Sequence, residues 1–147
     1  FLVKNNEWKS LVKNETLLKQ GYLSSSSERT VRIRISNTKG ILTIKSKSVG
    51  LKRMEFEYEI PLEDAQELIE LCEKPIIEKT RFEIEYASKI WEIDVFEGEN
   101  CGLIVAEIEL EFEEEPFEKP DWLLNEVSDD ERYFNFNLSK NPYSKWQ

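Results

Sequence analysis

Hydrophobic and polar residues alternate along much of this chain, and a period of two predicts β-strands with one apolar and one polar face. The alternation covers residues 31–36, 41–47, 53–60, 77–86, 90–97 and 103–113. After Pro61 the period changes, and apolar residues stand three and four positions apart as far as Cys72, which predicts one amphipathic helix. The chain is therefore predicted to be mainly β (an α+β protein), with antiparallel strands and a few helices.

The segments between these elements carry weaker patterns. A tryptophan and two aliphatic residues among polar neighbours predict a short helix over residues 5–14, and a shorter helix is predicted over residues 121–124. Residues 97–102 hold two glycines and an asparagine, which favours a hairpin turn. Residues 129–147 are aromatic-rich and are predicted to be irregular. With at least six strands, and the apolar start of the chain as a further candidate, the sheet is predicted to close into a barrel.

Composition narrows the possible chemistry. The 147 residues include 30 acidic and 20 basic side chains, a formal net charge of −10, and no histidine. The missing histidine excludes Ser-His-Asp and Cys-His nucleophile pairs, histidine-bound zinc and an imidazole base, so carboxylate, lysine, tyrosine or bound water must move any proton. Taken alone, the acidity argues against nucleic acid and anionic membranes as partners.

Length and apolar content indicate a single domain over residues 1–147, because 39% hydrophobic residues suffice for a core. The sequence contains no apolar run of about 18 residues, so no membrane span is predicted. Cys72 lies in the apolar stripe of the predicted helix and Cys101 lies beside a glycine. Both are predicted to be reduced thiols, which favours a cytoplasmic location.

The polar faces of the predicted strands are charged, and the signs are sorted by strand. The basic rows are Arg32 and Arg34, Lys45 and Lys47, and Lys79 and Arg81. The acidic rows are Glu55, Glu57 and Glu59, Glu92 and Asp94, and Glu107, Glu109 and Glu111. Like charges two residues apart repel one another at about 7 Å, so rows of like charge are unfavourable unless opposite charges compensate them.

Two interpretations account for the sorted charges. In the first, one face of the sheet is solvated and basic strands pair with acidic neighbours in cross-strand salt ladders, each pair contributing roughly 0–1 kcal/mol. In the second, the charged faces line an interior, where guanidinium and ammonium groups bind a phosphate chain and carboxylates hold Mg²⁺ or Mn²⁺. The second interpretation also removes the objection that an acidic chain should not bind an anion. A row of basic residues can bind phosphates locally, and bound cations offset part of the negative charge of the carboxylates.

Eight motifs follow one another along nearly the whole chain: Phe1-Leu2-Val3, Gln20-Gly21-Tyr22-Leu23, Arg32-Ile33-Arg34, Leu42-Thr43-Ile44-Lys45, Arg53-x-Glu55-x-Glu57-Tyr58-Glu59-Ile60, Lys79-x-Arg81, Trp91-Glu92-Ile93-Asp94-x-Phe96 and Ala106-Glu107-Ile108-Glu109-Leu110. Near the end, Asp129-Asp130-x-Arg132-Tyr133-x-Asn135 fits as well. In this order the motifs resemble the CYTH superfamily, the triphosphate tunnel metalloenzymes. The resemblance favours the second interpretation of the charges.

The resemblance implies a closed eight-stranded antiparallel barrel that forms a tunnel, with helices packed outside. It also implies metal-dependent hydrolysis of inorganic tripolyphosphate or a small organic triphosphate, with Mg²⁺ or Mn²⁺ as cofactor. The residues implied to bind the triphosphate are Arg32, Arg34, Lys45, Arg53, Lys79 and Arg81. The implied metal ligands are Asp94, Glu107 and Glu109, with Glu55 and Glu57 as supporting acidic residues.

Other residues near these motifs are expected to play lesser parts. Glu92 shares the face of Asp94 and is expected to be secondary to it as a metal contact. Solvated or field-shaping roles are expected for Lys47, Glu111 and Glu113, and packing roles for Phe56, Tyr58, Trp91, Ile108 and Leu110.

The family motif Glu-x-Glu-x-Lys stands immediately before a Phe-Leu-Val-like segment, and this chain begins at Phe1. We expect that the start has been lost, with two glutamate ligands and a lysine that assists the attacking water; the alternative is a degenerate member of the family. An adenylyl cyclase, a thiamine triphosphatase and a non-catalytic polyphosphate- or nucleotide-binding module stay open as other functions. The expected partner is a small triphosphate, not nucleic acid or a membrane, and a homodimer is compatible with the sequence.

Overall fold

One antiparallel sheet of seven strands organises this computed structural model, which describes residues 1–26, 28–47 and 54–146. The strands are β1 (Val12–Ser25), β2 (Arg29–Ser36), β3 (Lys39–Ser46), β4 (Glu55–Ile60), β5 (Ile77–Tyr86), β6 (Lys89–Phe96) and β7 (Ile104–Ile108). Their order across the sheet is β4-β3-β2-β1-β5-β6-β7, and every neighbouring pair is antiparallel. The helices are α1 (Leu62–Leu71) and α2 (Asn135–Lys140), with single 3₁₀ turns η1 (Glu7–Leu11), η2 (Gly98–Asn100), η3 (Glu131–Tyr133) and η4 (Tyr143–Lys145).

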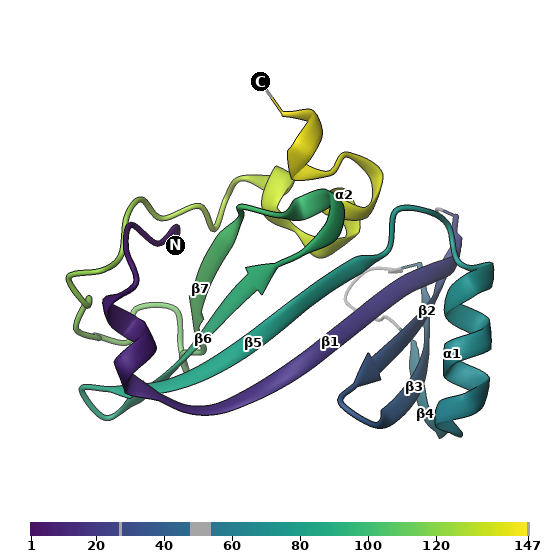
Figure 1. Cartoon of the computed structure of the whole chain (residues 1–147), viewed down its shortest axis with the longest axis horizontal. Helices are drawn as coiled ribbons and strands as arrows, with labels where there is room; N and C mark the ends of the chain where they lie inside the picture. The colour runs from purple at the N-terminus through teal and green to yellow at the C-terminus, as the bar shows by residue number, and fades with distance from the viewer. Residues whose placement is uncertain (27, 48–53, 147) are drawn as a thin grey trace.

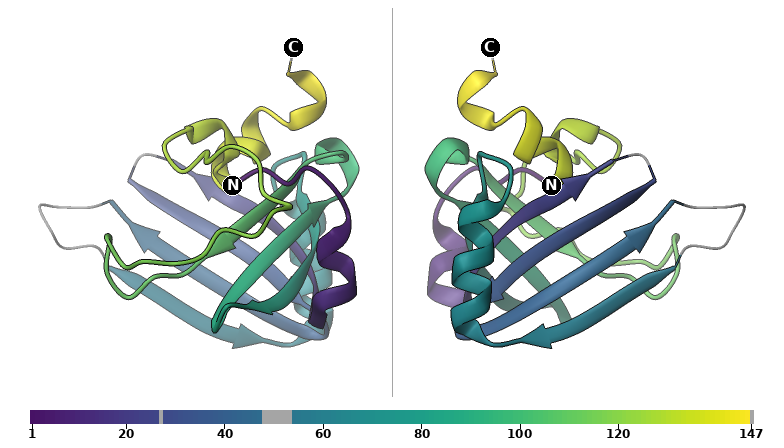
Figure 2. Two further views of the ribbon diagram at one scale, coloured as in Figure 1. Left: turned by 90° about the vertical axis from the view of Figure 1, so that its left-hand side faces the viewer. Right: turned by 90° about the vertical axis from the view of Figure 1, so that its right-hand side faces the viewer.

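The sheet is strongly curved, and α1 lies against its convex face (Figures 1 and 2). Helix α1 covers the convex side of β2 and β3, where Ala65 and Ile69 pack with Ile33 in a buried cluster. At the other end of the sheet, Trp8 of η1 packs against Trp91 of β6 and its apolar neighbours. The alternation of the strands places their charged side chains on the concave face.

Helix α2 lies on the concave side, at one end of the sheet (Figure 1). Its Leu138 is fully buried against Ile77 and Phe96, which share the face of the charged residues. An apolar cluster therefore closes one end of the concave face, and the charged side chains occupy the rest.

The closed eight-stranded barrel predicted for this chain is not confirmed, since the sheet has seven strands and is open. In the described residues the edge strands β4 and β7 do not pair with each other. The apolar start of the chain lies beside β7, where the Phe1 amino group donates a hydrogen bond of 2.9 Å to the carbonyl oxygen of Ala106. Leu2 and Val3 form single bridges with Val105 and Leu123, and these are too isolated to count as an eighth strand.

Each predicted strand matches a strand of the structure, with ends that differ by at most two residues in the described ranges except at the end of the last one. Residue 53 of the predicted strand 53–60 lies outside the described residues. Residues 77–86 form β5 as predicted, but β7 ends at Ile108, although the alternation continues to residue 113. The register places Ile108 opposite Trp91, and β6 begins only two residues before Trp91. Beyond Ile108 only Ile90 and Lys89 of β6 remain, so most of the alternating residues up to 113 have no strand backbone on β6 to pair with, and the alternating pattern alone could not predict the end of β7.

The helix predictions are confirmed in part. The amphipathic helix after Pro61 is α1, but only η1 forms within residues 5–14, and β1 already begins at Val12. Residues 121–124 form a turn and a bridge to Val3, so the helix predicted there is wrong, and the tail predicted to be irregular contains α2. None of the helices in the described ranges combines the length and apolar character needed to cross a membrane.

Contact between α1 and β3 depends on Gly40. A Cβ added there would lie 2.7 Å from the Cβ of Ala65, closer than side chains pack. Gly40→Ala is expected to lower the free energy of unfolding by about 1–3 kcal/mol in urea denaturation. Adding Ala65→Gly should restore part of the loss, because it removes the clash but costs roughly 1 kcal/mol of helix propensity. Unchanged stability of Gly40→Ala would contradict this close packing.

Candidate functional site

Cationic side chains from three strands share the concave face. Arg32 stands opposite Thr43 of β3 and Tyr22 of β1, and Arg34 stands opposite Gln20 of β1. The predicted anion-binding residues that the structure places on this face are Arg32, Arg34, Lys45, Lys79 and Arg81. The sixth predicted residue, Arg53, lies outside the described residues.

Arg32 and Arg34 lack acidic partners. Arg34 donates from Nε to Oε1 of Gln20 over 3.0 Å, and Arg32 donates from Nη2 to Oγ1 of Thr43 over 3.5 Å. Neither guanidinium forms an ion pair with a carboxylate in residues 1–26, 28–47 and 54–146. Burial, followed by the positive charges of Arg32 and Arg81, lowers the pKa of Arg34. Such a group of cations is stabilised by an anion that neutralises them.

Lys45 extends this basic group towards the edge of the sheet. Its Nζ lies 3.9 Å from Oε1 of Glu55 on β4, a distant and partly exposed ion pair. A cavity of about 320 Å³ opens beside it, lined by Tyr22, Thr30, Arg32, Thr43, Lys45 and Phe136. Two guanidinium or ammonium groups and two threonine hydroxyls therefore face one space, which suits an anion with several oxygen atoms.

Asp94 binds two of the predicted anion-binding residues. Its Oδ2 accepts from Lys79 Nζ over 2.8 Å and from Arg81 Nη2 over 2.9 Å, and its Oδ1 accepts from Arg81 Nε over 2.8 Å. Burial alone would raise the pKa of Asp94, which is 2% exposed, but its hydrogen bonds to Arg81 and the charges of Lys79 and Arg81 lower it. Burial lowers the pKa of Lys79 despite the nearby Asp94.

Metal binding by Asp94 stays a prediction, and in this structure its carboxylate contacts cationic donors. Both of its oxygen atoms are already used by cationic donors, which would compete with a metal ion for the same lone pairs. The hydrogen bonds to Asp94 raise the pKa of Arg81 and hold its guanidinium in one orientation. In this structure Asp94 is therefore placed to orient Arg81 and Lys79.

Glutamates line up across three neighbouring strands. Glu92 of β6 stands opposite Glu83 of β5 and Glu107 of β7. Burial raises the pKa of Glu92, and the charges of Asp94, Glu107 and Glu83 add to this effect, whereas Arg81 opposes it. Arg81 Nη1 lies 3.3 Å from Oε2 of Glu92, which links the acidic row to the basic group. Facing carboxylates repel one another unless a cation lies between them.

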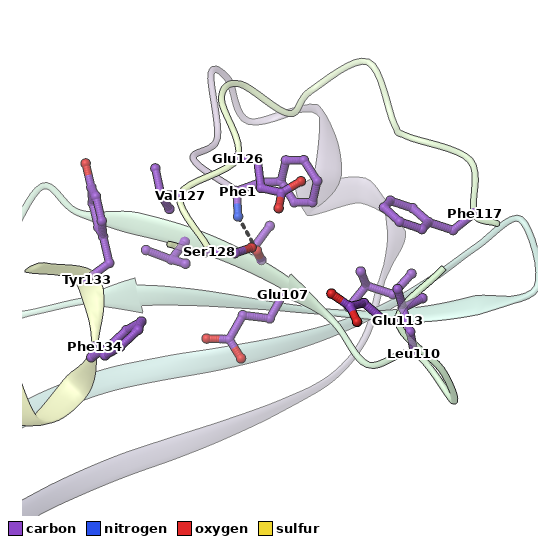
Figure 3. A pocket seen from close by; sticks show the side chains of 13 residues that line it. Phe1, Glu107, Leu110, Glu113, Phe117, Glu126, Val127, Ser128, Tyr133 and Phe134 are labelled. Atoms are coloured by element: carbon purple, nitrogen blue, oxygen red, sulfur yellow. Dashed lines mark hydrogen bonds between the residues drawn. The ribbon is translucent and has the colours of Figure 1, made fainter. Parts of the chain in front are cut away.

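Glu107 and Glu109 lie in different surroundings. Glu107 lines a pocket of about 420 Å³ beside Phe1 and Glu126, with Glu113 and Phe117 at its far side (Figure 3). Glu109 follows the end of β7 and lines another cavity, of about 490 Å³, together with Glu83 and Glu92. Only Glu107 of this predicted pair is held by the ladder of the sheet.

The carboxylates fit a divalent metal ion only as a partial ligand set. In the part of the chain that the structure describes, no three acidic or cysteine side chains are arranged to hold a metal ion. Glu92 and Glu107 nevertheless supply oxygen ligands from facing positions, and Mg²⁺ commonly uses one or two carboxylates together with waters and substrate phosphates. The donor set is therefore compatible with Mg²⁺ or Mn²⁺.

Each interpretation of the sorted charges explains part of the site. Salt ladders form where Lys45 meets Glu55 and where Arg81 meets Asp94 and Glu92. Among the described residues, no salt ladder forms at Arg32 and Arg34. Glu55 and Glu57 are exposed on the edge strand, and Glu57 stands opposite Thr43 and has only a long-range influence on Arg34.

Neutral residues of the site were not predicted from the sequence. Gln20, Tyr22 and Thr43 face the cations, and Asn135 of α2 accepts a hydrogen bond from Lys79 over 3.3 Å. Gln20, Tyr22 and Asn135 all lie within the motifs that carried the resemblance, which is the one signal that could have pointed to them.

Comparisons with known proteins agree with this geometry. The family model described as the CYTH domain matches residues 1–141. An inorganic triphosphatase of Acetivibrio thermocellus is 49% identical over 148 residues, which cover 100% of this chain and 94% of that protein. An inorganic triphosphatase of Nitrosomonas europaea is 34% identical over 126 residues, covering 83% of each.

Solved structures show the same fold. The crystal structure of an inorganic triphosphatase matches with a TM-score of 0.78 and 30% identity, over 95% of this chain and 93% of that one. A putative adenylyl cyclase from Hippeastrum, described as having a dominant triphosphatase activity, matches with a TM-score of 0.51 and 17% identity over 76% of this chain and 78% of its own. With a family model that covers nearly all of its length and a relative of 49% identity, this chain belongs to the CYTH family.

Proposed function

We propose that this protein hydrolyses inorganic triphosphate to pyrophosphate and phosphate with the help of a divalent cation. The observation that carries the proposal is the pair of guanidinium groups of Arg32 and Arg34, which face the concave side without a carboxylate partner in the described residues. The acidic pair Glu92 and Glu107 lies on the same face. The two most similar curated relatives named above are inorganic triphosphatases, which supports the same substrate.

The basic residues would bind the phosphate chain and offset its charge. Arg32, Arg34 and Lys45 supply donors from one side of the face, while Asp94 holds Arg81 and Lys79 on the other. Phosphoryl transfer is catalysed mainly by positioning and by stabilisation of charge on the phosphoryl oxygens, so a row of fixed cations is well suited to it.

The acidic residues would complete the site. Glu92 and Glu107 would hold a Mg²⁺ or Mn²⁺ ion, which when bound would offset the charge of the phosphate chain and make a water more acidic. In the overall step the water oxygen forms a bond to a terminal phosphorus and the bridging P–O bond breaks. The electron pair of that bond leaves with pyrophosphate, and the two protons of water end on the products or on solvent.

An enclosed tunnel around the substrate belongs to the same proposal. The curvature of the sheet and the apolar closure of one end by α2 support it (Figure 2). Enclosure would exclude water from the phosphate chain and strengthen its attraction to the arginines.

Phosphate release from tripolyphosphate tests the proposal. It should require Mg²⁺ or Mn²⁺ and stop when EDTA removes the metal. Glu107→Gln should raise the Mn²⁺ concentration for half-maximal rate by roughly tenfold or more, because it removes a proposed charged ligand. Glu63→Gln, an exposed change on α1, is the matched control and should behave as the unchanged protein.

The assay should include both this chain and a version that carries Glu-x-Glu-x-Lys before Phe1. If neither version releases phosphate but tripolyphosphate binds, the protein is a binding module and the proposed hydrolysis is wrong. If release proceeds equally well in EDTA, the role proposed for the metal is wrong.

A further inference from the structure

Gln20 is a neutral residue that lies next to Arg34 on the concave face. It lies in β1, between Arg34 of β2 and Ile77 of β5, and its side chain is 0% exposed. Its position in the strand places it on the concave face, two residues from Tyr22 and in the same row as Arg34. Buried polar groups are nearly always hydrogen-bonded, so both the oxygen and the nitrogen of this amide should have partners.

One half of the amide has a partner, and that partner determines how the group is oriented. Oε1 accepts a hydrogen bond of 3.0 Å from Nε of Arg34. A guanidinium nitrogen can only donate, so the atom facing it must be the oxygen of the amide. The nitrogen Nε2, with its two N–H donors, therefore points away from Arg34.

The other half of the amide has no partner. Nε2 of Gln20 is buried and makes no hydrogen bond within the described residues, and Nε of Arg32 on the neighbouring strand is in the same condition. Arg34, which stands opposite Gln20, and Arg32 and Arg81, whose charges act on Arg34, offer donors and no acceptor. An anion bound on this face would supply the acceptor that these two donors lack in the described residues.

We propose that Gln20 is a substrate-binding residue, whose Nε2 donates to an oxygen of the same phosphoryl group that Arg34 binds. The inference rests on the proposed function and adds a neutral, directional contact to it. The amide then has two tasks, because Oε1 orients the guanidinium of Arg34 while Nε2 contacts the anion. Tripolyphosphate satisfies both unpaired donors at once.

Binding of tripolyphosphate by Gln20→Met tests the proposal. Methionine keeps the length of the side chain and removes its hydrogen bonds. Calorimetry in EDTA, where no turnover is expected, should show an approximately tenfold weaker Kd, the usual effect of losing one hydrogen bond to a charged group. The melting temperature should change little, because loss of the hydrogen bond from Arg34 offsets the removal of a buried unpaired donor. Gln66→Met, the same change at an exposed position of α1, is the matched control and should alter neither value.

A second variant separates direct contact from an effect that passes through Arg34. In an Arg34→Met background, Gln20→Met should still weaken binding at least threefold if Nε2 touches the anion. If the double variant binds as Arg34→Met alone does, Gln20 acts only by orienting Arg34 and the proposed contact is wrong.

The outcomes for the inference and for the proposed function are distinct. If tripolyphosphate is hydrolysed and Gln20→Met binds it as tightly as the unchanged protein, only the inference fails. If tripolyphosphate binds without hydrolysis and Gln20→Met weakens that binding, the hydrolytic function fails and the inference stands. If tripolyphosphate neither binds in EDTA nor is hydrolysed with Mg²⁺ or Mn²⁺, both are overturned.

Discussion

Replacing Arg34 with methionine is expected to lower kcat/KM for tripolyphosphate by about a hundredfold or more, which corresponds to two charge-assisted hydrogen bonds. The free energy of unfolding should change by less than about 1 kcal/mol. The reason is that Arg34 makes one hydrogen bond, to Gln20, and is repelled by Arg32 and Arg81. Loss of the hydrogen bond lowers the free energy of unfolding, whereas relief of the repulsion raises it.

Steady-state kinetics and urea denaturation measure the two effects. Arg29→Met is the matched control, because Arg29 lies in the same strand, is exposed, and has a register that places it on the other face of the sheet. It should leave both kcat/KM and stability unchanged. An Arg34→Met variant with undiminished kcat/KM would show that the unpaired guanidinium does not bind substrate.

Asp94→Asn is expected to destabilise the fold by roughly 3–5 kcal/mol, the usual cost of removing one partner from a buried ion pair. The substitution leaves Lys79, which is almost fully buried, and Arg81 without the carboxylate that they share. Urea denaturation at neutral pH measures the loss. Asp121→Asn, an exposed carboxylate outside the sheet, is the control and should change stability little.

The effect of Asp94 should depend on pH in a definite direction. Its pKa is lower in the folded than in the unfolded chain, where it is about 3.9. The stabilisation is therefore present above pH 4 and is lost as the pH falls through the lower, folded pKa. The difference in stability between the unchanged protein and Asp94→Asn should shrink accordingly in acid.

Metal titration distinguishes the two roles considered for Asp94. If it orients Lys79 and Arg81, saturating Mn²⁺ should raise the melting temperature of the unchanged protein and of Asp94→Asn by similar amounts. A stabilisation by Mn²⁺ that disappears in Asp94→Asn would restore Asp94 as a metal ligand.

The faces of the strands could be predicted from the sequence, but the partners across them could not. Alternation alone assigns Arg32, Arg34 and Asp94 to the polar face, since the pleat has a period of two. Whether a cation meets a carboxylate or an amide depends on the register between strands. The register sets Arg81 opposite Asp94 but Arg34 opposite Gln20. Register follows from long-range packing, which a single sequence does not display.

The first half of β1 was missed for a related reason. Its apolar residues do not alternate: Leu17 and Leu18 are adjacent, and Leu17 is 61% exposed. This half of the strand forms because β5 pairs with its backbone from Val12 onward, whereas β2 joins the other side only from Leu18. Backbone pairing of this kind leaves little trace in the pattern of side chains.

The edge strand β4 affects whether the sheets of two molecules can pair edge to edge. Glu55, Glu57 and Glu59 stand on one face of that edge strand, all exposed. If β4 joined its counterpart in a second molecule as an antiparallel strand, these carboxylates would be brought face to face. Charged side chains on an edge strand discourage such growth of the sheet from one molecule into the next. The acidity that accompanies the proposed phosphate site would thus also oppose pairing of β4 strands between molecules.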